Sequence, residues 1–364
     1  MAGDAVPAAS PQAATLGTWF GERGLAQAEL PSGGSVCLRF STAVEEHLAT
    51  RQGAGIFDFS FMGWWAFGGP RALDCLQQLQ TRDLRWMQPG TICYTLICRD
   101  DGSVFVDATV WRVAADLFWL FTGRRSDAAL IQRQACAHDM ELAFMSDRHA
   151  TIAVQGPSSA RLVEQALNER VTDLPYFGFR QQRLDGQPIW IARLGYTGEL
   201  GYELLVPSHH AVTLWSRLAS TPFDGKRREC GMEAADGLRI EAGFIHFAHE
   251  LAQPVWPAEL GLERLVRSEP DGFIGQRALA QAAAASRRLK GVRIVPGLDC
   301  RARHARTFGP IRLTSEAHSP LFGCTLGLAL VDRRHHAADT VRIEDGRGGE
   351  LVDLPFRARQ APRP

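Results

Sequence analysis

The stretch 195–203 reads Gly-Tyr-Thr-Gly-Glu-Leu-Gly-Tyr-Glu and combines backbone freedom with polar and aromatic groups. Its three glycines within seven positions let the chain turn sharply and approach a ligand closely. Its carboxylates and phenols offer acceptors and aromatic faces that suit a flat heterocycle rich in N–H groups, such as a pterin. A glycine-rich turn between two strands also has a purely structural interpretation, so the stretch needs support from the rest of the chain.

A second candidate group is the carboxylate of Asp107, which lies in a β-prone run. The runs 94–98 and 104–113 flank Asp100, Asp101 and Gly102. Since Asp followed by Gly supplies the positive φ angle of a tight turn, the sequence predicts a β-hairpin here. A carboxylate held beside an amine cofactor can orient it and stabilise developing positive charge. The alternative is a strand-end aspartate bonded to nearby backbone.

Hydrophobic periodicity predicts the elements that position these groups. The segment 41–52 is predicted to be an amphipathic helix, with Glu46 and Arg51 away from its apolar side. Strands are predicted at 55–59, 117–122 and 150–155, and two more at 188–194 and 202–206 bracket the glycine-rich turn. Helices are predicted at 70–79 and 231–242, and short β-like pieces after Pro257 indicate a small terminal β domain.

Composition limits the class of protein. With 364 residues, 45% of them hydrophobic and 22% charged, the chain is predicted to fold into two or three domains. Forty basic residues balance forty acidic ones, so we expect neither a nucleic-acid partner nor a membrane partner. The eight cysteines contain no CxxC pair, which argues against a metal or disulfide framework. Residues 1–15 are interpreted as a disordered lead-in without signal-peptide features, so a cytoplasmic location is expected.

Further short motifs occur in an order that is typical of one known family. They lie at 55–60 (Gly-Ile-Phe-Asp-Phe-Ser), 102–110 around Asp107, 153–157 (Ala-Val-Gln-Gly-Pro), 238–243 (Leu-Arg-Ile-Glu-Ala-Gly), 319–320 and 354–356. Together with 195–203 they resemble the glycine cleavage T-protein (aminomethyltransferase) family over about residues 36–357.

The resemblance implies an α+β fold with three domains in a cloverleaf-like arrangement around a central folate channel. Residues 16–52 plus 150–253 would form a discontinuous folate-binding domain. Residues 53–149 would form a ferredoxin-like second domain. Residues 254–364 would form a small C-terminal β-barrel or jelly-roll domain.

The resemblance also implies a tetrahydrofolate cofactor and particular site residues. Asp107 would be catalytic by orienting the folate nitrogens at the reacting carbon, and Glu203 would hydrogen-bond the pterin ring. Tyr196 is a second catalytic candidate that could pass a proton or line the pocket, or could simply be packed. The remaining expected cofactor-binding residues are Tyr94, Thr197, Gly198, Glu199 and Arg239. No metal site is expected, although His246 and His249 have a spacing that would suit one.

Three departures from the family pattern leave the substrate open. Ala235 stands where relatives carry a folate-contacting arginine, Gly123 where they usually carry Asn, and Phe61 where they carry His. We therefore expect a transferase that moves a methyl or methylene group from a small amine, ether or thioether donor. One alternative is an orthodox aminomethyltransferase acting on a lipoyl carrier protein. Another is a non-catalytic folate-binding module, although the cysteine of that branch is missing near Tyr196.

Overall fold

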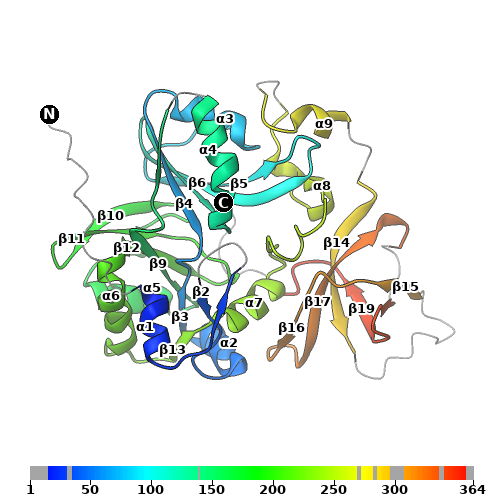
Figure 1. Cartoon of the computed structure of the whole chain (residues 1–364). Coiled ribbons are helices and arrows are strands. Elements are labelled where there is room, and N and C mark those ends of the chain that lie inside the picture. Colours follow the sequence, from blue (N-terminus) through cyan, green and yellow to red (C-terminus); the bar gives the residue numbers. More distant parts are fainter. Residues whose placement is uncertain are drawn as a thin grey trace.

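The structure is a computed structural model that describes residues 15–30, 35–137, 140–268, 272–281, 285–295, 307–335 and 340–357. Within these ranges the chain is a mixture of helices and β-sheets, which confirms the predicted α+β class. Three larger sheets account for most strands, and a small ribbon pairs β1 (Gln27–Glu29) with β2 (Ser35–Cys37) (Figure 1). The predicted lead-in lies outside the described residues except for Thr15, which caps α1 (Leu16–Glu22).

The first sheet holds the glycine-rich turn. In sheet order its strands are β10 (Phe179–Leu184), β11 (Gln187–Ala192), β12 (Gly201–Pro207), β9 (His149–Gln155), β3 (Ala54–Asp58) and β13 (Arg227–Cys230). Neighbours are antiparallel except β3 and β13, which run parallel. The expected domain division starts the second domain at residue 53, whereas β3 is hydrogen-bonded inside this first sheet.

Helices cover one face of the first sheet. They are α1, α5 (Ser159–Leu167) and α6 (Ser208–Ser220). In α6, Ala211, Leu214, Trp215 and Leu218 recur at intervals of three and four residues, so they form one apolar stripe. This stripe packs on side chains such as Leu204 from the sheet, and the cluster is the largest apolar core of the first sheet.

The second sheet carries the predicted hairpin. In sheet order its strands are β5 (Thr91–Cys98), β6 (Val104–Ala114), β7 (Leu117–Thr122), β4 (Gly63–Gly68) and β8 (Glu141–Phe144), all antiparallel. Helices α3 (Ala72–Leu79) and α4 (Ala128–Ala137) cover one face. The helices follow the expected ferredoxin-like pattern, but the sheet has five strands where a β-α-β-β-α-β unit has four. The hairpin prediction is confirmed by β5 and β6.

The third sheet belongs to the C-terminal part of the chain. In sheet order its strands are β15 (Thr307–Ile311), β18 (Thr340–Ile343), β19 (Gly348–Val352), β14 (Arg287–Ile294), β17 (Cys324–Asp332) and β16 (Ser315–Ser319). A terminal β unit was therefore predicted correctly. Among the described residues the end strands β15 and β16 are not paired with each other, so closure into a barrel is not confirmed.

Two helices connect the sheets. The helix α7 (Met232–Glu241) packs against α2 (Ala43–Gln52) on one side and β16 on the other (Figure 1). The uncovered faces of the first and second sheets share an aromatic cluster that includes Trp111 of β6 and Leu205 of β12. The short elements are α8 (Pro257–Leu260), α9 (Gln276–Gln281), η1 (Arg125–Asp127), η2 (Glu263–Leu265) and η3 (Arg333–His335). No helix in the described ranges is long and apolar enough to cross a membrane.

Candidate active site

The glycine-rich turn joins β11 to β12, and two of its glycines are required by packing. A Cβ atom at Gly195 would lie 1.9 Å from Oε1 of Gln155, and one at Gly201 would lie 2.3 Å from Nε2 of the same side chain. Gly198 has a φ angle of +76°, which glycine adopts without strain, and a Cβ there would meet Ala242 at 2.7 Å. The glycines therefore let the turn lie directly on β9 and on the end of α7.

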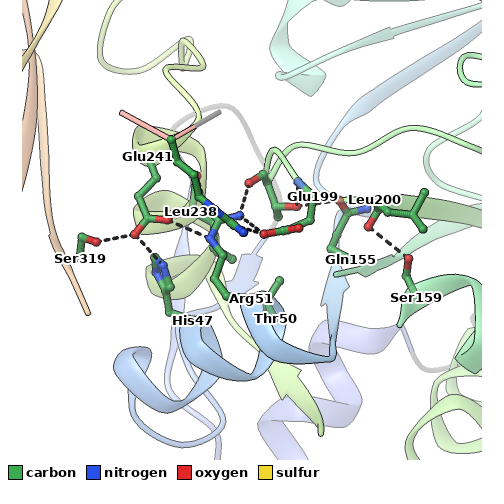
Figure 2. Close-up of polar contacts among 12 residues, drawn as sticks. His47, Thr50, Arg51, Gln155, Ser159, Glu199, Leu200, Leu238, Glu241 and Ser319 are labelled. Carbon is green, nitrogen blue, oxygen red and sulfur yellow. Dashed lines mark hydrogen bonds and ion pairs between the residues drawn. The ribbon is translucent and has the colours of Figure 1, made fainter. Parts of the chain in front are cut away.

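A buried guanidinium holds this turn in place (Figure 2). Arg51 of α2 donates to the backbone oxygen of Thr197 at 2.8 Å and to the Glu199 carboxylate at 2.9 Å. It also donates to Glu241 of α7 at 2.9 Å from Nε and 2.6 Å from Nη2, and to the backbone oxygen of Leu238. One side chain thus joins α2, the glycine-rich turn and α7.

Further groups complete the Arg51 network. His47 Nε2 lies 2.9 Å from Glu241 Oε1, and the Ser319 hydroxyl of β16 donates to the same oxygen at 2.5 Å (Figure 2). Arg357, near the end of the described chain, pairs with Glu199. The hydrogen bonds and cationic partners hold the pKa of Glu241 below its usual value even though burial raises it. The network therefore ties the C-terminal part of the chain to the turn.

The helix face that carries Arg51 was interpreted wrongly from the sequence. Glu46 and Arg51 were placed on the polar, outward side of the helix, but they are 0% and 8% exposed. Glu46 accepts hydrogen bonds from the backbone N–H groups of Phe40, Ser41 and Gly231 at 2.6–2.8 Å. Both groups are buried because each one finds its partners in distant segments, and amphipathic periodicity carries no information about such partners.

Three of the expected cofactor-binding residues are engaged in structural contacts. The Thr197 side chain is fully buried and donates to Gln155 at 2.9 Å. Glu199 is paired with Arg51 and Arg357. Arg239 is 0% exposed and donates to Asp236 at 2.7 Å, Glu250 at 2.8 Å and the Ser315 hydroxyl at 2.7 Å. These contacts favour supporting roles over direct cofactor contact for Thr197, Glu199 and Arg239.

Tyr196 is packed rather than poised for proton transfer. Its hydroxyl donates to the backbone oxygen of Ile245 at 2.5 Å, and its ring stacks on Phe244 with 5.8 Å between centroids. Burial raises the pKa of the phenol well above its ordinary value, and the carboxylate of Asp107 is among the charges that act on it. The packing alternative is therefore favoured, and the tyrosine brings the glycine-rich turn within electrostatic range of Asp107.

The predicted catalytic carboxylate lies on β6. Tyr94 on the adjacent strand β5 donates a hydrogen bond to Asp107 Oδ2 at 3.0 Å. Burial raises the pKa of Asp107 to about 6, while the Tyr94 hydrogen bond and the Arg124 charge oppose that shift. Side chains alternate along a strand, so Asp107 points to the same face as Trp111 and away from the helix-covered side. The Asp107 carboxylate therefore faces the interior between the sheets.

The second predicted carboxylate, Glu203 on β12, is buried without a partner. It is 7% exposed, and among the described residues its carboxylate makes no hydrogen bond or ion pair. Its neighbours across the strands are the small residues Ala192 and Ala153. Burial alone raises its pKa to about 7. Glu203 shares its sheet face with Leu205, so it points toward the same aromatic cluster as the Asp107 face.

The structure also shows where the three positions that depart from the family pattern lie. Ala235 of α7 is fully buried in an apolar cluster with Phe57 and Phe59, and Phe61 packs against that cluster. Gly123 directly follows β7. In the described part of the chain, no group of three or more His, Cys, Asp or Glu side chains is placed to hold a metal ion, and this includes the region of His246 and His249.

Comparison with known proteins defines the class. The model of the GCVT N-terminal domain matches residues 16–269. The aminomethyltransferases of Streptomyces coelicolor and Streptomyces avermitilis are each 34% identical to this chain, over 350 and 348 residues, and each alignment covers 90% of this chain and 93% of the relative. A solved structure of the glycine cleavage system aminomethyltransferase T from Bartonella henselae superimposes with a TM-score of 0.80 at 22% identity, covering 95% of this chain and 98% of that one. The fold is thus that of the T-protein, and the chain belongs to the glycine cleavage T-protein family.

Replacing Arg51 should destabilise the protein strongly. Arg51→Met would leave the carboxylates of Glu199 and Glu241 buried with fewer partners, and we expect a loss of about 3–5 kcal/mol in the free energy of unfolding, measured by urea titration. Arg228→Met is the matched control, because Arg228 pairs with Glu45 at 3.7 Å and the two side chains are 46% and 51% exposed. Its loss should stay below about 1 kcal/mol. Equal losses in the two variants would contradict the proposed importance of the network.

Glu203 should make the protein less stable as the pH rises. Its pKa rises from 4.5 to about 7 on folding, so between these values the unfolded chain ionises first and the folded form loses stability. Above pH 7 the penalty reaches roughly 3 kcal/mol at most. Glu203→Gln should therefore gain stability relative to the native chain between pH 5 and pH 8 in urea titrations without ligand. The exposed control Glu22→Gln should leave the pH profile unchanged, and a Glu203→Gln profile that parallels the native one would contradict the prediction.

Proposed function

We propose that this protein is a tetrahydrofolate-dependent one-carbon transferase that acts on a small amine, ether or thioether donor. Its family membership and the name aminomethyltransferase carried by its curated relatives support transfer chemistry of this type. The observation that carries the proposal is the pair of inward-facing carboxylates, Asp107 with its Tyr94 hydrogen bond and Glu203 without a partner among the described residues.

The residues present fit a reduced folate. A buried carboxylate without donors of its own is costly unless a ligand supplies them. The N–H-rich edge of a pterin supplies such donors, so Glu203 would hold that edge. Tyr94 lies beside Asp107 and would line the reacting end. Thr197, Gly198, Glu199 and Arg239 would act by shaping and fixing the surrounding backbone, which is a narrower role than the resemblance implied.

Asp107 would serve the transfer itself. When bound, the folate supplies the amine nitrogen that accepts the one-carbon unit. For a methyl group, the bond from carbon to the donor heteroatom would break, a carbon–nitrogen bond would form, and the displaced N–H proton would end on the donor heteroatom. No oxidant or reductant is needed. Asp107, ionised above about pH 6, stabilises the positive charge on the nitrogen and can carry its proton.

Two other functions are alternatives to the proposed small-donor transferase. The relatives' printed name, aminomethyltransferase, favours an orthodox aminomethyltransferase, for which the family resemblance implies a lipoyl carrier protein as the partner. Ala235 and Gly123 favour the small-donor proposal, because both remove side chains from positions that the family pattern uses. The second alternative is a folate-binding module without turnover. A cytoplasmic location is a separate prediction from the sequence.

Substitution of Glu203 should impair folate binding, whereas substitution of Asp107 should impair turnover. Titration with tetrahydrofolate should quench the fluorescence of the nine tryptophans with saturation. Glu203→Gln should weaken binding by roughly 10-fold or more, since the variant places an amide N–H group where only acceptors fit. Asp107→Asn should still bind but lose about 100-fold or more in kcat with any donor that the native chain turns over. The absence of a saturable response in the native chain would overturn the proposal.

The activity of the native chain should depend on the ionisation of Asp107. As the pH falls below about 6, protonation of this carboxyl should lower kcat/KM about tenfold per pH unit. Asp107→Asn should lose this inflection. Asp116→Asn is the control in the same pair of strands, because Asp116 is exposed in the turn between β6 and β7, and it should keep the inflection. A native profile that is flat from pH 5 to pH 8 would contradict the role of Asp107.

A further inference from the structure

The position directly across from Asp107 is a glycine. Strands β6 and β7 pair Thr109 with Phe121 and Ala108 with Thr122. Continuing this antiparallel register by one residue places Gly123 opposite Asp107. Residues that face each other in an antiparallel pair point to the same side of the sheet. A side chain at position 123 would therefore stand beside the Asp107 carboxylate, on the interior face.

The ring of Phe247 occupies the place of that side chain. A Cβ atom built on Gly123 would lie 2.4 Å from Cδ1 and 2.9 Å from Cε1 of Phe247, which is closer than nonbonded carbons approach. Phe247 follows α7 in the chain and packs against two apolar clusters. One is the helix-covered cluster of the second sheet, and the other is the cluster of the C-terminal part, against which Tyr94, the hydrogen-bond partner of Asp107, also packs. It also lies against the imidazole of His246, with 4.2 Å between ring centroids. The ring is thus held on several sides.

Arg124, the residue after Gly123, also lies near the Phe247 ring. The guanidinium of Arg124 lies over the ring of Phe105 at 4.6 Å and near the ring of Phe247 at 5.9 Å. Phe105 is two residues before Asp107, at the point where the register of β6 against β5 shifts, and its ring packs against the helix-covered cluster of the second sheet. Arg124 is anchored by Asp127 at 2.9 Å and by the backbone oxygen of Phe105 at 3.3 Å. The Arg124 guanidinium, whose charge acts on the Asp107 carboxylate, thus lies against both aromatic rings.

We propose that Phe247 is a specificity-determining residue, and that its ring, seated against Gly123, restricts the Asp107 site to compact one-carbon donors. This inference rests on the proposed function and names its substrate class. With glycine at position 123, the donor contacts the aromatic ring of Phe247 and not a polar side chain that could form hydrogen bonds. The ring also reduces the space available to the donor by about the volume of a phenyl group. A methylated amine of a few heavy atoms fits these conditions, whereas an aminomethyl group on the long arm of a carrier protein does not.

The contact itself is tested by a double-mutant cycle that needs no substrate. Gly123→Ala should lower the free energy of unfolding measurably, because the new methyl group collides with the Phe247 ring. The same change made in a Phe247→Ala background should cost much less, since the ring is gone. Additive effects of the two substitutions would show that the ring does not fill the space beside Gly123, and would overturn the inference.

Donor choice is tested by comparing kcat/KM for two probes. The compact probe is N,N-dimethylglycine, and the large probe is a lipoylated carrier protein loaded with its aminomethyl group. Phe247→Ala should shift the ratio of kcat/KM toward the large probe by at least about 10-fold. Phe223→Ala is the matched control, because Phe223 is also half-buried beneath an arginine but packs on the helix-covered face of the first sheet. The control should leave the ratio unchanged.

The outcomes separate the two proposals. Tetrahydrofolate binding by the native chain is measured in parallel, and failure to bind would overturn the proposed function itself. Binding together with an unchanged donor ratio in Phe247→Ala would leave the proposed function standing and overturn the role of Phe247. If the native chain binds tetrahydrofolate but neither turns over the compact probe nor is stabilised by it against thermal unfolding, the compact-donor class is wrong.

Discussion

The buried guanidinium of Arg51 is the interaction on which the interior of this molecule depends. Arg51 donates hydrogen bonds to the glycine-rich turn and to α7. Its partners Glu241 and Glu199 in turn contact Ser319 and Arg357 of the C-terminal part. A buried cation is tolerated only when its partners are in place, because desolvation of an unpaired charge costs several kcal/mol. The positions of the glycine-rich turn, α7 and the C-terminal residues are therefore coupled through this one side chain and its partners.

The interior contains two kinds of carboxylate, and their surroundings separate their roles. Glu199 and Glu241 are surrounded by cationic and hydroxyl donors, so their charge is balanced inside the protein. Asp107 has one phenol donor and Glu203 has none among the described residues, and burial raises the pKa of both. Buried charges without protein partners reduce stability, and proteins keep them mainly where a ligand uses them. This contrast supports a structural role for Glu199 and Glu241 and a ligand-binding or catalytic role for Asp107 and Glu203.

Local patterns predicted much of the fold. The hairpin of β5 and β6 follows from an Asp-Gly turn between two β-prone runs. Its register makes Tyr94 a diagonal neighbour of Asp107, within hydrogen-bond distance. Ordered motifs predicted the family, which the comparisons confirm. Contacts between distant segments were not predictable. Arg51 and Glu241 are 190 residues apart, and nothing in the pattern of a helix indicates that its charged side is buried. The contact of Gly123 with Phe247 is hidden for the same reason, since a glycine does not reveal which ring lies above it.

The pairing of Arg357 with Glu199 has a consequence for biosynthesis. The strands of the first two sheets end at Cys230, so they can pack while the ribosome is still translating the remainder, because domains generally fold as they emerge. The glycine-rich turn, however, is supported by a residue made 158 positions later than its partner. The first two sheets can therefore form while Glu199 still lacks one of its cations. Its set of partners is completed once the last strand and the segment behind it have been made.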